Sequence, residues 1–436
     1  MRVEFLNHFS YDIEPPKGAV SVPNLSRFAP SGTAYFVVGQ IQYIDPFCTT
    51  LFGQGNFVQI QGDWNVSNSQ DLVFKSHQVL QAGDQVFIPV VNEDGRWAVE
   101  RNKNGGLLAP SFNEWKSRFQ TKSKIYLWPM FLQRVREFFY KNDFIEVPTP
   151  SLVENPGMEI HLQPFVTHWN LGSRKTKFYL PTSPEIHLKK HLCLGWNQIF
   201  EIKSCYRDQE ISSIHQPEFL LLEWYRSFAS LEAIQLDIKN LFIDITNFFK
   251  GEMELPEFVG LNISDLLEKS TGKKMPVEGD HASMLNFVHL LGLQADPNDN
   301  WDELFNQIMV EFIEPHIKKI NSAVFVSGYP RSHAALAKVN KKGEAQRFEL
   351  YWKGVELANA FYELNDPFEQ RARLEGEQKQ REKMKSEVPS LDEEFLNALE
   401  SSMPPTSGIA MGLERLFMVC SGLNSLNDFL PFAKKT

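Results

Sequence analysis

The stretch YRDQE at residues 206–210, followed by HQPEF at 215–219, decides how the rest of the chain is interpreted. Its arginine and its histidine lie eight residues apart, and both side chains are suited to contact the phosphates of a nucleotide triphosphate. Two later stretches have a similar mixture of charged, small and apolar residues: RFELYWKGVELAN at 347–359 and SGIAMGLER at 407–415. These three segments are the candidate chemical motifs of the chain.

The composition is that of a soluble globular protein with two or three domains, since the chain has 436 residues, of which 42% are hydrophobic and 22% charged. A net charge of −10 argues against a surface built mainly for nucleic acid, although it leaves room for one basic face. No apolar run approaches the ~18 residues of a membrane span, and the N-terminus lacks the pattern of a signal peptide. The four cysteines are scattered without metal-site spacing. We therefore expect a cytoplasmic protein that does not enter a membrane.

The N-terminal quarter predicts a small β domain. Residues 1–30 are rich in Pro, Ser and Gly and predict an irregular leader, whereas short β-type runs separated by turn signals fill 31–108. About five short strands in this length favour an OB-like barrel, with another β topology as the alternative. Lys75 and Arg96 are the only Lys or Arg residues between 31 and 100, which is thin for a nucleic-acid groove. We interpret it as a degenerate or repurposed domain that docks a protein or buttresses a dimer.

Residues 109–436 predict a larger α+β domain. Apolar residues recur with helical spacing over 126–139, and a strand at 144–150 is ended by prolines. A second amphipathic helix is predicted over 231–249. The run 371–385 mixes both signs of charge and predicts a solvated helix rather than a binding arm.

A hairpin is predicted over 347–356, with Lys353 and Gly354 at its turn. It would bring Glu349 and Glu356 together, and two neighbouring carboxylates repel unless a cation lies between them. Hard oxygen ligands of this kind suit Mg²⁺ bound together with phosphates. The alternative is a surface hairpin with ordinary exposed glutamates.

Several acids predict a pocket for a cationic substrate. Asn359, Phe361 and Glu363 alternate onto one face of a strand. Glu223 lies in the apolar run LLEWYR, and a buried charge needs a partner. If Glu185 converged on the same pocket, the three acids would suit a substrate with two ammonium groups. The alternative is that each acid pairs with a neighbouring arginine.

From about residue 115 to the C-terminus, the chain resembles the class II aminoacyl-tRNA synthetases, and within them the lysine branch. YRDQE…HQPEF matches motif 2, SGIAMGLER matches motif 3, TSPE at 182–185 matches the element that meets the amine of the amino acid, and 126–150 resembles motif 1. The resemblance implies an antiparallel sheet flanked by helices, ATP as co-substrate, Mg²⁺, and a homodimer through motif 1. A core helix would explain 126–139 equally well.

The resemblance also implies a role for individual residues. The catalytic arginines would be Arg207 and Arg415, and the magnesium ligands Glu349 and Glu356. The amino acid would contact Ser183, Glu185, Glu223, Tyr225, Asn359, Glu363 and Ala410. ATP would contact Arg207, Asp208, Gln209, His215, Gln216, Phe219, Glu356, Leu357, Gly412 and Arg415. Forming an acyl-adenylate from a carboxylate and ATP needs positioning and neutralisation of charge on phosphate oxygens, with no general base.

Within the lysine branch, SGIAMG resembles the elongation factor P β-lysine ligases, because Ala410 stands where tRNA synthetases have glycine. One methyl group in a pocket shifts discrimination by about 1–3 kcal/mol. The resemblance implies activation of (R)-β-lysine or lysine and its transfer to a lysine of elongation factor P. It disfavours tRNA as the acceptor without excluding it.

Several residues depart from the family pattern, and two of them, Gln209 and Ala360, favour a catalytically silent paralogue. Gln209 replaces a glutamate that accepts a hydrogen bond from adenine, Gln216 replaces asparagine, Glu414 replaces aspartate, and Ala360 replaces glycine. A methyl group at 360 would crowd the pocket. The alternatives are a lysine–tRNA ligase and a catalytically silent paralogue that binds an amino acid or a partner protein.

Overall fold

The computed structural model describes residues 124–434 except 126, 161, 250 and 297, and, before residue 124, the backbone of the strands alone. The chain divides into two compact units, Met1–Ser123 and Lys124–Thr436. Within the described residues, no helix combines the length and the apolar character needed to cross a membrane.

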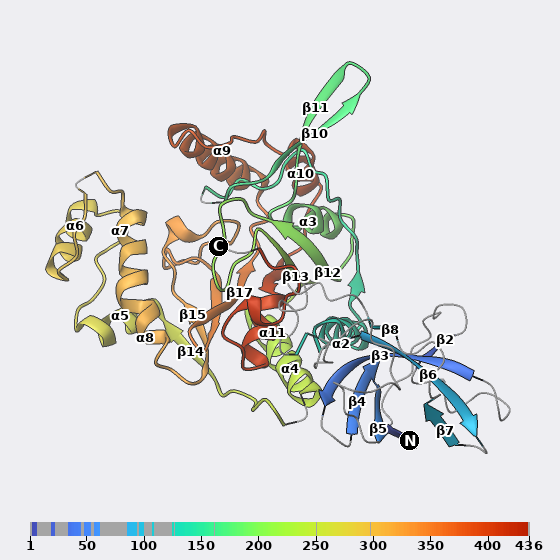
Figure 1. Cartoon of the computed structure of the whole chain (residues 1–436). Coiled ribbons are helices and arrows are strands. Elements are labelled where there is room, and N and C mark those ends of the chain that lie inside the picture. The colour runs from blue at the N-terminus through green and yellow to red at the C-terminus, as the bar shows by residue number, and fades with distance from the viewer. Residues whose placement is uncertain are drawn as a thin grey trace. The chain divides into compact units, whose positions relative to one another are not determined.

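The strands of the N-terminal unit form one sheet in the order β1-β5-β4-β3-β6-β7, with β2 paired to β3 and β8 paired to β6 (Figure 1). The segment expected to be an irregular leader contributes β1 and β2, and in β1 apolar side chains alternate with charged ones, as in a strand. The segments that would define an OB-like topology lie largely outside the described residues, so that topology and the 30/31 and 108/109 boundaries stay predictions. The strands are β1 (Arg2–Leu6), β2 (Ala19–Ser21), β3 (Ala34–Ile44), β4 (Cys48–Gly53), β5 (Asn56–Gln61), β6 (Gln85–Glu93), β7 (Arg96–Val99) and β8 (Leu107–Leu108).

A second eight-stranded sheet organises the C-terminal unit. Its inner pairs are antiparallel, as expected, but both edge pairs are parallel, so the sheet is mixed. From edge to edge the strands are β14 (Phe258–Asn262), β15 (Ala323–Ser327), β16 (Arg347–Trp352), β17 (Val355–Tyr362), β18 (Thr406–Gly412), β13 (Glu218–Ser227), β12 (Gln198–Tyr206) and β9 (Ile145–Glu146).

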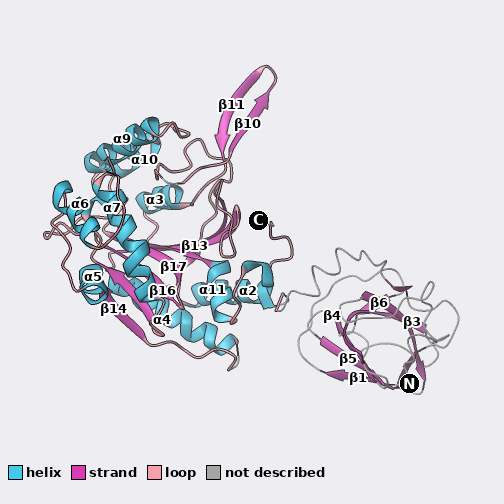
Figure 2. Cartoon of the chain, turned by 60° about the vertical axis from the view of Figure 1, so that its left-hand side comes forward, coloured by secondary structure: helices cyan, strands magenta, loops and turns pink. Residues whose placement is uncertain are grey.

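Helices cover both faces of this sheet (Figure 2). On one face, α2 (Leu127–Lys141), α4 (Leu231–Phe248) and α11 (Leu413–Cys420) bury aromatic and aliphatic side chains against residues such as Phe200 and Trp224. On the other face, α3 (Glu185–Cys193) and α10 (Glu393–Glu400) pack against Ile199 and Tyr225. Because side chains alternate along a strand, the two neighbours of each core residue face the second side of the sheet. That second side carries the candidate site.

The helices predicted from sequence periodicity are confirmed as α2 and α4, each within two residues of the expected ends. The predicted hairpin is also confirmed, since β16 and β17 are joined by Lys353 and Gly354, both with positive φ. The strand expected over 144–150 is only two residues long, because Pro148 and Pro150 cannot donate to a ladder.

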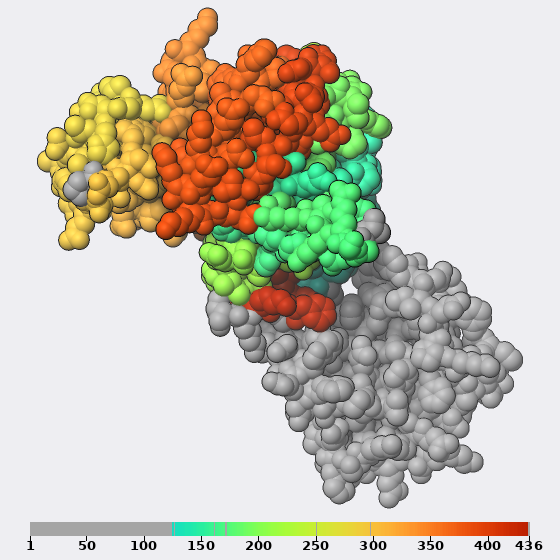
Figure 3. Space-filling view, turned by 90° about the horizontal axis from the view of Figure 1, so that it is seen from above, coloured from blue at the N-terminus to red at the C-terminus, as the bar shows by residue number. Residues whose placement is uncertain are grey.

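The remaining elements are a helical insertion between β14 and β15, a hairpin, the helix α9 and two 3₁₀ turns. The insertion builds its own core against β14 and β15 and makes a distinct lobe (yellow in Figure 3). The hairpin projects away from the unit (Figure 1). The elements are α5 (Ile263–Thr271), α6 (His281–Leu290), α7 (Trp301–Ile308), a π turn (Met309–Ile313), α8 (Glu314–Ile317), the hairpin β10 (Val166–Leu171) and β11 (Arg174–Tyr179), α9 (Pro367–Lys383), and the 3₁₀ turns η3 (Arg331–His333) and η4 (Leu426–Asp428).

Candidate active site

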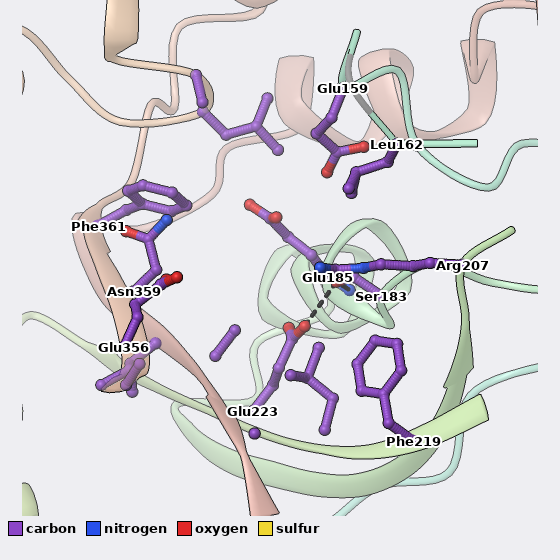
Figure 4. A pocket seen from close by; sticks show the side chains of 18 of the residues that line it. Glu159, Leu162, Ser183, Glu185, Arg207, Phe219, Glu223, Glu356, Asn359 and Phe361 are labelled. Carbon is purple, nitrogen blue, oxygen red and sulfur yellow. Dashed lines mark hydrogen bonds between the residues drawn. The ribbon is translucent and has the colours of Figure 1, made fainter. Parts of the chain in front are cut away.

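A cavity of about 440 Å³ opens on the α3 side of the sheet and brings most of the predicted site residues together (Figure 4). Asn359 and Phe361 lie on one side of it, and Arg207 and Phe219 on the other. Asp208, Gln209 and Glu349 are the three predicted residues that do not line it. Those that do are Ser183, Glu185, Arg207, His215, Gln216, Phe219, Glu223, Tyr225, Glu356, Leu357, Asn359, Glu363, Ala410, Gly412 and Arg415.

Strand register places three of these residues side by side at the floor of the cavity. Ala410 on β18 pairs with Glu223 on β13 and with Asn359 on β17. Directly opposed residues on neighbouring strands point to the same face. The Ala410 methyl group therefore lies between a carboxylate and an amide, and any added or missing methyl there changes the space between them.

Glu223 is a buried acid without a cationic partner among the described residues. Its side chain is 1% exposed. Ser183 Oγ donates to Glu223 Oε1 at 2.5 Å, and Tyr225 Oη donates to Oε2 at 3.0 Å. Burial, reinforced by the nearby Glu185 carboxylate, raises the pKa of Glu223 well above its usual value. A carboxylate held only by hydroxyl groups in a cavity is suited to receive an ammonium group.

Glu185 and Glu363 have a different partner from the arginines considered as the alternative. The Lys189 Nζ atom lies 2.6 Å from Glu185 Oε1 and 2.6 Å from Glu363 Oε2, and the lysine side chain is fully buried. Burial alone would lower the pKa of Lys189, but the two carboxylates outweigh it and raise that pKa. Lys189 was not singled out from the sequence, although its spacing of four residues from Glu185 on a helix predicts contact.

The opposite end of the cavity carries the positive charge. The Arg207 guanidinium stacks over the Phe219 ring at 5.0 Å from its centroid, and its Nε atom is buried with no hydrogen-bond partner among the residues that the structure describes. The nearest acid is Glu210, 3.8 Å away. Arg207 is thus held in place by an aromatic face, with donors left for an anionic group.

Arg415 and His215 form the second part of this end. Arg415 Nη1 donates to the main-chain oxygen of Glu356 at 3.1 Å, and Nη2 donates to His215 Nε2. Ser212 Oγ lies 2.8 Å from the other ring nitrogen of His215. Burial and the Arg415 charge lower the pKa of His215, so its imidazole is neutral and accepts from the guanidinium.

Gln209, which was expected to contact adenine, does not line the cavity. Gln209 has a left-handed backbone (φ 66°) and is exposed outside the cavity, whereas the following residue, Glu210, lines it. Ala360 was expected to crowd the cavity, but it is buried in the core on the opposite face of the sheet. Strand alternation explains this, because its neighbours Asn359 and Phe361 face the cavity.

Glu349 and Glu356 lie near enough to repel each other, but Glu349 is paired with Asn359 in the hairpin and only Glu356 lines the cavity. Arg347 and the hydroxyls of Tyr329 and Tyr351 bind Glu349. Tyr351 pairs with Glu356 while Leu350 pairs with Ala358, so the register shift makes a bulge that turns Glu356 toward the cavity.

The donor chemistry of this acid pair fits Mg²⁺. Burial, followed by repulsion from Glu349, raises the pKa of Glu356 to about 7. Among the described residues no group of three or more His, Cys, Asp or Glu side chains could hold a metal. Two carboxylates are nevertheless enough for Mg²⁺, which is commonly bound by one or two carboxylates together with substrate phosphates.

Besides Glu210, two further acids that the sequence analysis missed line the cavity: Glu159 and Glu377. Glu159 follows Gly157, where φ is +120° and an added Cβ would lie 2.5 Å from Glu159 Oε2. Glu377 belongs to α9, which was expected to be a solvated helix. That expectation was wrong for one face, because Leu374 and Arg381 are buried. Mixed charge along a helix does not reveal which face is covered.

Residues 110–436 match the family described as class II tRNA synthetases for aspartate, lysine and asparagine. The chain belongs to the class II tRNA synthetase family. The match begins near the end of the N-terminal unit and covers every residue of the cavity, so the motifs quoted from the sequence and the family agree.

Individual relatives of this synthetase family member fall into two groups. The elongation factor P–(R)-β-lysine ligase of Haemophilus influenzae is 33% identical over 306 residues, which are 69% of this chain and 92% of that protein. The ligase of the same name from Proteus mirabilis is 34% identical with the same coverage. The lysine–tRNA ligase of Oceanobacillus iheyensis is 33% identical over 331 residues, or 73% of this chain and 64% of that protein.

Proposed function

We propose that this class II synthetase-like enzyme activates (R)-β-lysine, or lysine, with ATP as an aminoacyl-adenylate and transfers it to a lysine of elongation factor P. The observation that carries the proposal is the pairing of Ala410 with Glu223 and Asn359. It places a methyl group beside a buried carboxylate that has no cationic partner within the described residues. The relatives named for the (R)-β-lysine activity support the same substrate.

In the activation step, the amino-acid carboxylate attacks the α-phosphorus of ATP, and pyrophosphate leaves. Arg207 is positioned to bind the carboxylate and the α-phosphate, while Arg415 and His215 bind the departing phosphates. Fixed cationic groups of this kind stabilise charge that builds up on phosphate oxygens without reorganising during the reaction. Mg²⁺, held by Glu349 and Glu356 when bound, would neutralise more of that charge.

Glu223 receives one ammonium group of the substrate, and Ser183 and Tyr225 hold its carboxylate in place. Asn359 offers an amide oxygen that is buried and has no hydrogen-bond partner in the described part of the chain. Glu363 remains near this end, although Lys189 already neutralises part of its charge. Ala410 fills the floor between Glu223 and Asn359, and this favours one lysine isomer by about 1–3 kcal/mol.

The proposal includes two features outside the cavity. A homodimer would form through the motif 1 region around α2 and β9, and the N-terminal unit would dock the acceptor protein or buttress that dimer. Both expectations come from the family resemblance and from the sparse positive charge of residues 31–100.

Pyrophosphate exchange tests the first half-reaction. Exchange should be supported by (R)-β-lysine, more weakly by lysine, and least by (S)-β-lysine. Arg207→Ala should lower it by about 10²–10³-fold, because one charged contact to the transition state is lost. Full exchange in that variant, or no exchange with any lysine isomer, would refute the proposal.

A competition between elongation factor P and tRNA as acceptors tests the second half-reaction. Labelled product on elongation factor P alone supports the proposal, and product on tRNA alone establishes the lysine–tRNA ligase alternative, which the Oceanobacillus iheyensis relative keeps open. Gln209 and Ala360 favoured the silent-paralogue alternative, but both lie outside the cavity lining. Neither residue therefore argues against catalysis in this cavity.

A further inference from the structure

Resting on the proposed function, we propose that Glu377 is the general base of the transfer step and takes a proton from the ammonium group of the acceptor lysine. The activation step needs no base, but the transfer step does. A lysine side chain arrives as an ammonium group, which cannot attack a carbonyl carbon until it loses a proton. A base must therefore lie where the acceptor enters.

The entry route is a second cavity of about 540 Å³ that adjoins the active-site cavity. Ala335 and Glu377 line both cavities, so these two residues mark the junction. The outer cavity has room for an extended lysine side chain. Its other polar walls come from the helical insertion, the η3 turn and α9: Glu278, Asp302, Arg331, Ser332, Glu369, Arg373 and Gln380.

The position of α9 at this junction is fixed by two arginines, each four residues from Glu377 and therefore on the same helix face. Arg373 Nη1 donates to the main-chain oxygens of Ala335 and Ala337, both at 2.7 Å. Its Nη2 donates to Glu369 at 2.6 Å. Arg373 thereby holds the helix against one side of the junction.

Arg381 holds the helix against the other side. Its side chain is 1% exposed, and Nη1 donates to the main-chain oxygens of Glu159 at 2.5 Å and Leu162 at 2.9 Å. Arg381 thus binds main-chain oxygens, and Arg373 binds main-chain oxygens and Glu369. Glu377, between them, forms no ion pair or hydrogen bond within the described part of the chain, so its carboxylate is available to an incoming group.

The charges around Glu377 tune it for proton transfer. Burial raises its pKa most, Glu159 and Glu185 raise it further, and Arg373 and Arg381 lower it, so that the pKa lies at about 8. Glu159 belongs to the loop before β10 and Glu185 to α3. A base is most effective when its pKa is close to the working pH, because it is then partly ionised and still accepts a proton readily.

The acceptor ammonium gives one proton to the Glu377 carboxylate, and the freed electron pair on Nζ forms a bond to the carbonyl carbon of the aminoacyl-adenylate. The bond from that carbon to the phosphate oxygen breaks, and AMP leaves with its electron pair. The second proton on nitrogen is lost to solvent as the amide forms. No oxidant or reductant takes part.

The test compares Glu377→Gln with Glu382→Gln, a control on the exposed side of the same helix. Pyrophosphate exchange with (R)-β-lysine is measured first, because only the activation step contributes to it. Preformed enzyme-bound adenylate is then discharged in a single turnover onto elongation factor P or onto hydroxylamine, which is already neutral at neutral pH and needs no base.

We expect Glu377→Gln to keep wild-type exchange and hydroxylamine discharge but to transfer to elongation factor P about 10²–10⁴-fold more slowly. The wild-type transfer rate should rise with pH and level off above about 8, whereas the rate of the variant should keep rising toward the lysine pKa of about 10.4, because only amine that is already neutral then reacts. Unchanged transfer, or an equal loss of exchange and transfer, overturns the inference. Absence of exchange in the wild-type enzyme refutes the proposed function instead, so the two failures are distinguishable.

Discussion

Lys189 Nζ lies 2.6 Å from Glu363 Oε2, with both side chains almost completely shielded from solvent. The same ammonium also contacts Glu185. The Lys189 ammonium group is thus already paired with two of the three acids that were expected to recognise the substrate. Glu223 is then the acid left for a substrate ammonium group, and the amino-acid end of the cavity depends on Lys189 for its charge balance.

Lys189→Met should destabilise the protein by about 3–5 kcal/mol, because it leaves two carboxylates buried without a counter-ion. Burial already raises the pKa of Glu363 to about 8 against the pull of Lys189. Without the lysine that pKa rises further above its unfolded value, so the loss of stability is largest at high pH and shrinks as pH falls. Urea unfolding of the variant, from below the ordinary glutamate pKa of 4.5 to above the Glu363 value of about 8, measures both effects.

Lys190→Met is the matched control for that measurement. The Lys190 side chain is 16% exposed, and its ammonium contacts the largely buried Asp392 and the exposed Glu394, so, unlike Lys189, it retains contact with water and its loss should cost less. A loss for Lys190→Met as large as that for Lys189→Met would contradict the assignment of the buried pair.

The fold and the location of the cavity were predictable from sequence because their signals are local. Strand alternation correctly placed Asn359, Phe361 and Glu363 on one face, and two positive-φ residues closed the expected hairpin. The charge partners were not predictable in this way. The one exception is the Lys189–Glu185 contact, which helical spacing predicts. Lys189 meets Glu363 from a segment 174 residues away, and Glu377 lies near Glu185, 192 residues away. Side-chain charge alone does not say which acid a buried lysine will meet. The bulge beside Leu357, which turns Glu356 toward the cavity, also leaves no signature in the pattern of the strand.

Ala410→Gly should shift preference from (R)-β-lysine toward lysine. Removing the methyl group between Glu223 and Asn359 enlarges the floor of the cavity by one methyl volume, and one such group changes discrimination by about 1–3 kcal/mol. The ratio of kcat/KM for the two amino acids in pyrophosphate exchange measures the shift. Gly260→Ala in β14, where an added Cβ meets nothing within 4 Å, should leave the ratio unchanged. An unaltered kcat/KM ratio in Ala410→Gly would show that the Ala410 methyl group does not determine which amino acid is preferred.

ATP binding should take up protons near neutral pH through His215. Burial and Arg415 lower the pKa of the free imidazole, and a triphosphate beside it would raise that pKa again. Affinity for ATP should then increase as pH falls through the range between the two pKa values. Calorimetry in two buffers of different ionisation enthalpy measures the uptake. His215→Gln, and AMP in place of ATP, should both show none, and equal uptake in the variant would place the titrating group elsewhere.

Gly408→Ala adds only one methyl group, but it should disrupt the amino-acid end of the cavity. Gly408 pairs with Tyr225 on one side and Phe361 on the other. A Cβ added there would lie 2.3 Å from the Tyr225 ring and 2.5 Å from Glu363 Oε1, far inside van der Waals contact. Tyr225 must therefore move, and its hydroxyl can no longer hold Glu223 at 3.0 Å.

Overpacking of this kind costs about 1–3 kcal/mol, and the displaced carboxylate should raise KM for the amino acid while KM for ATP stays constant. Thermal unfolding and exchange kinetics separate the two effects. A variant that is less stable but has normal KM for the amino acid would show that Tyr225 does not position Glu223 for the substrate.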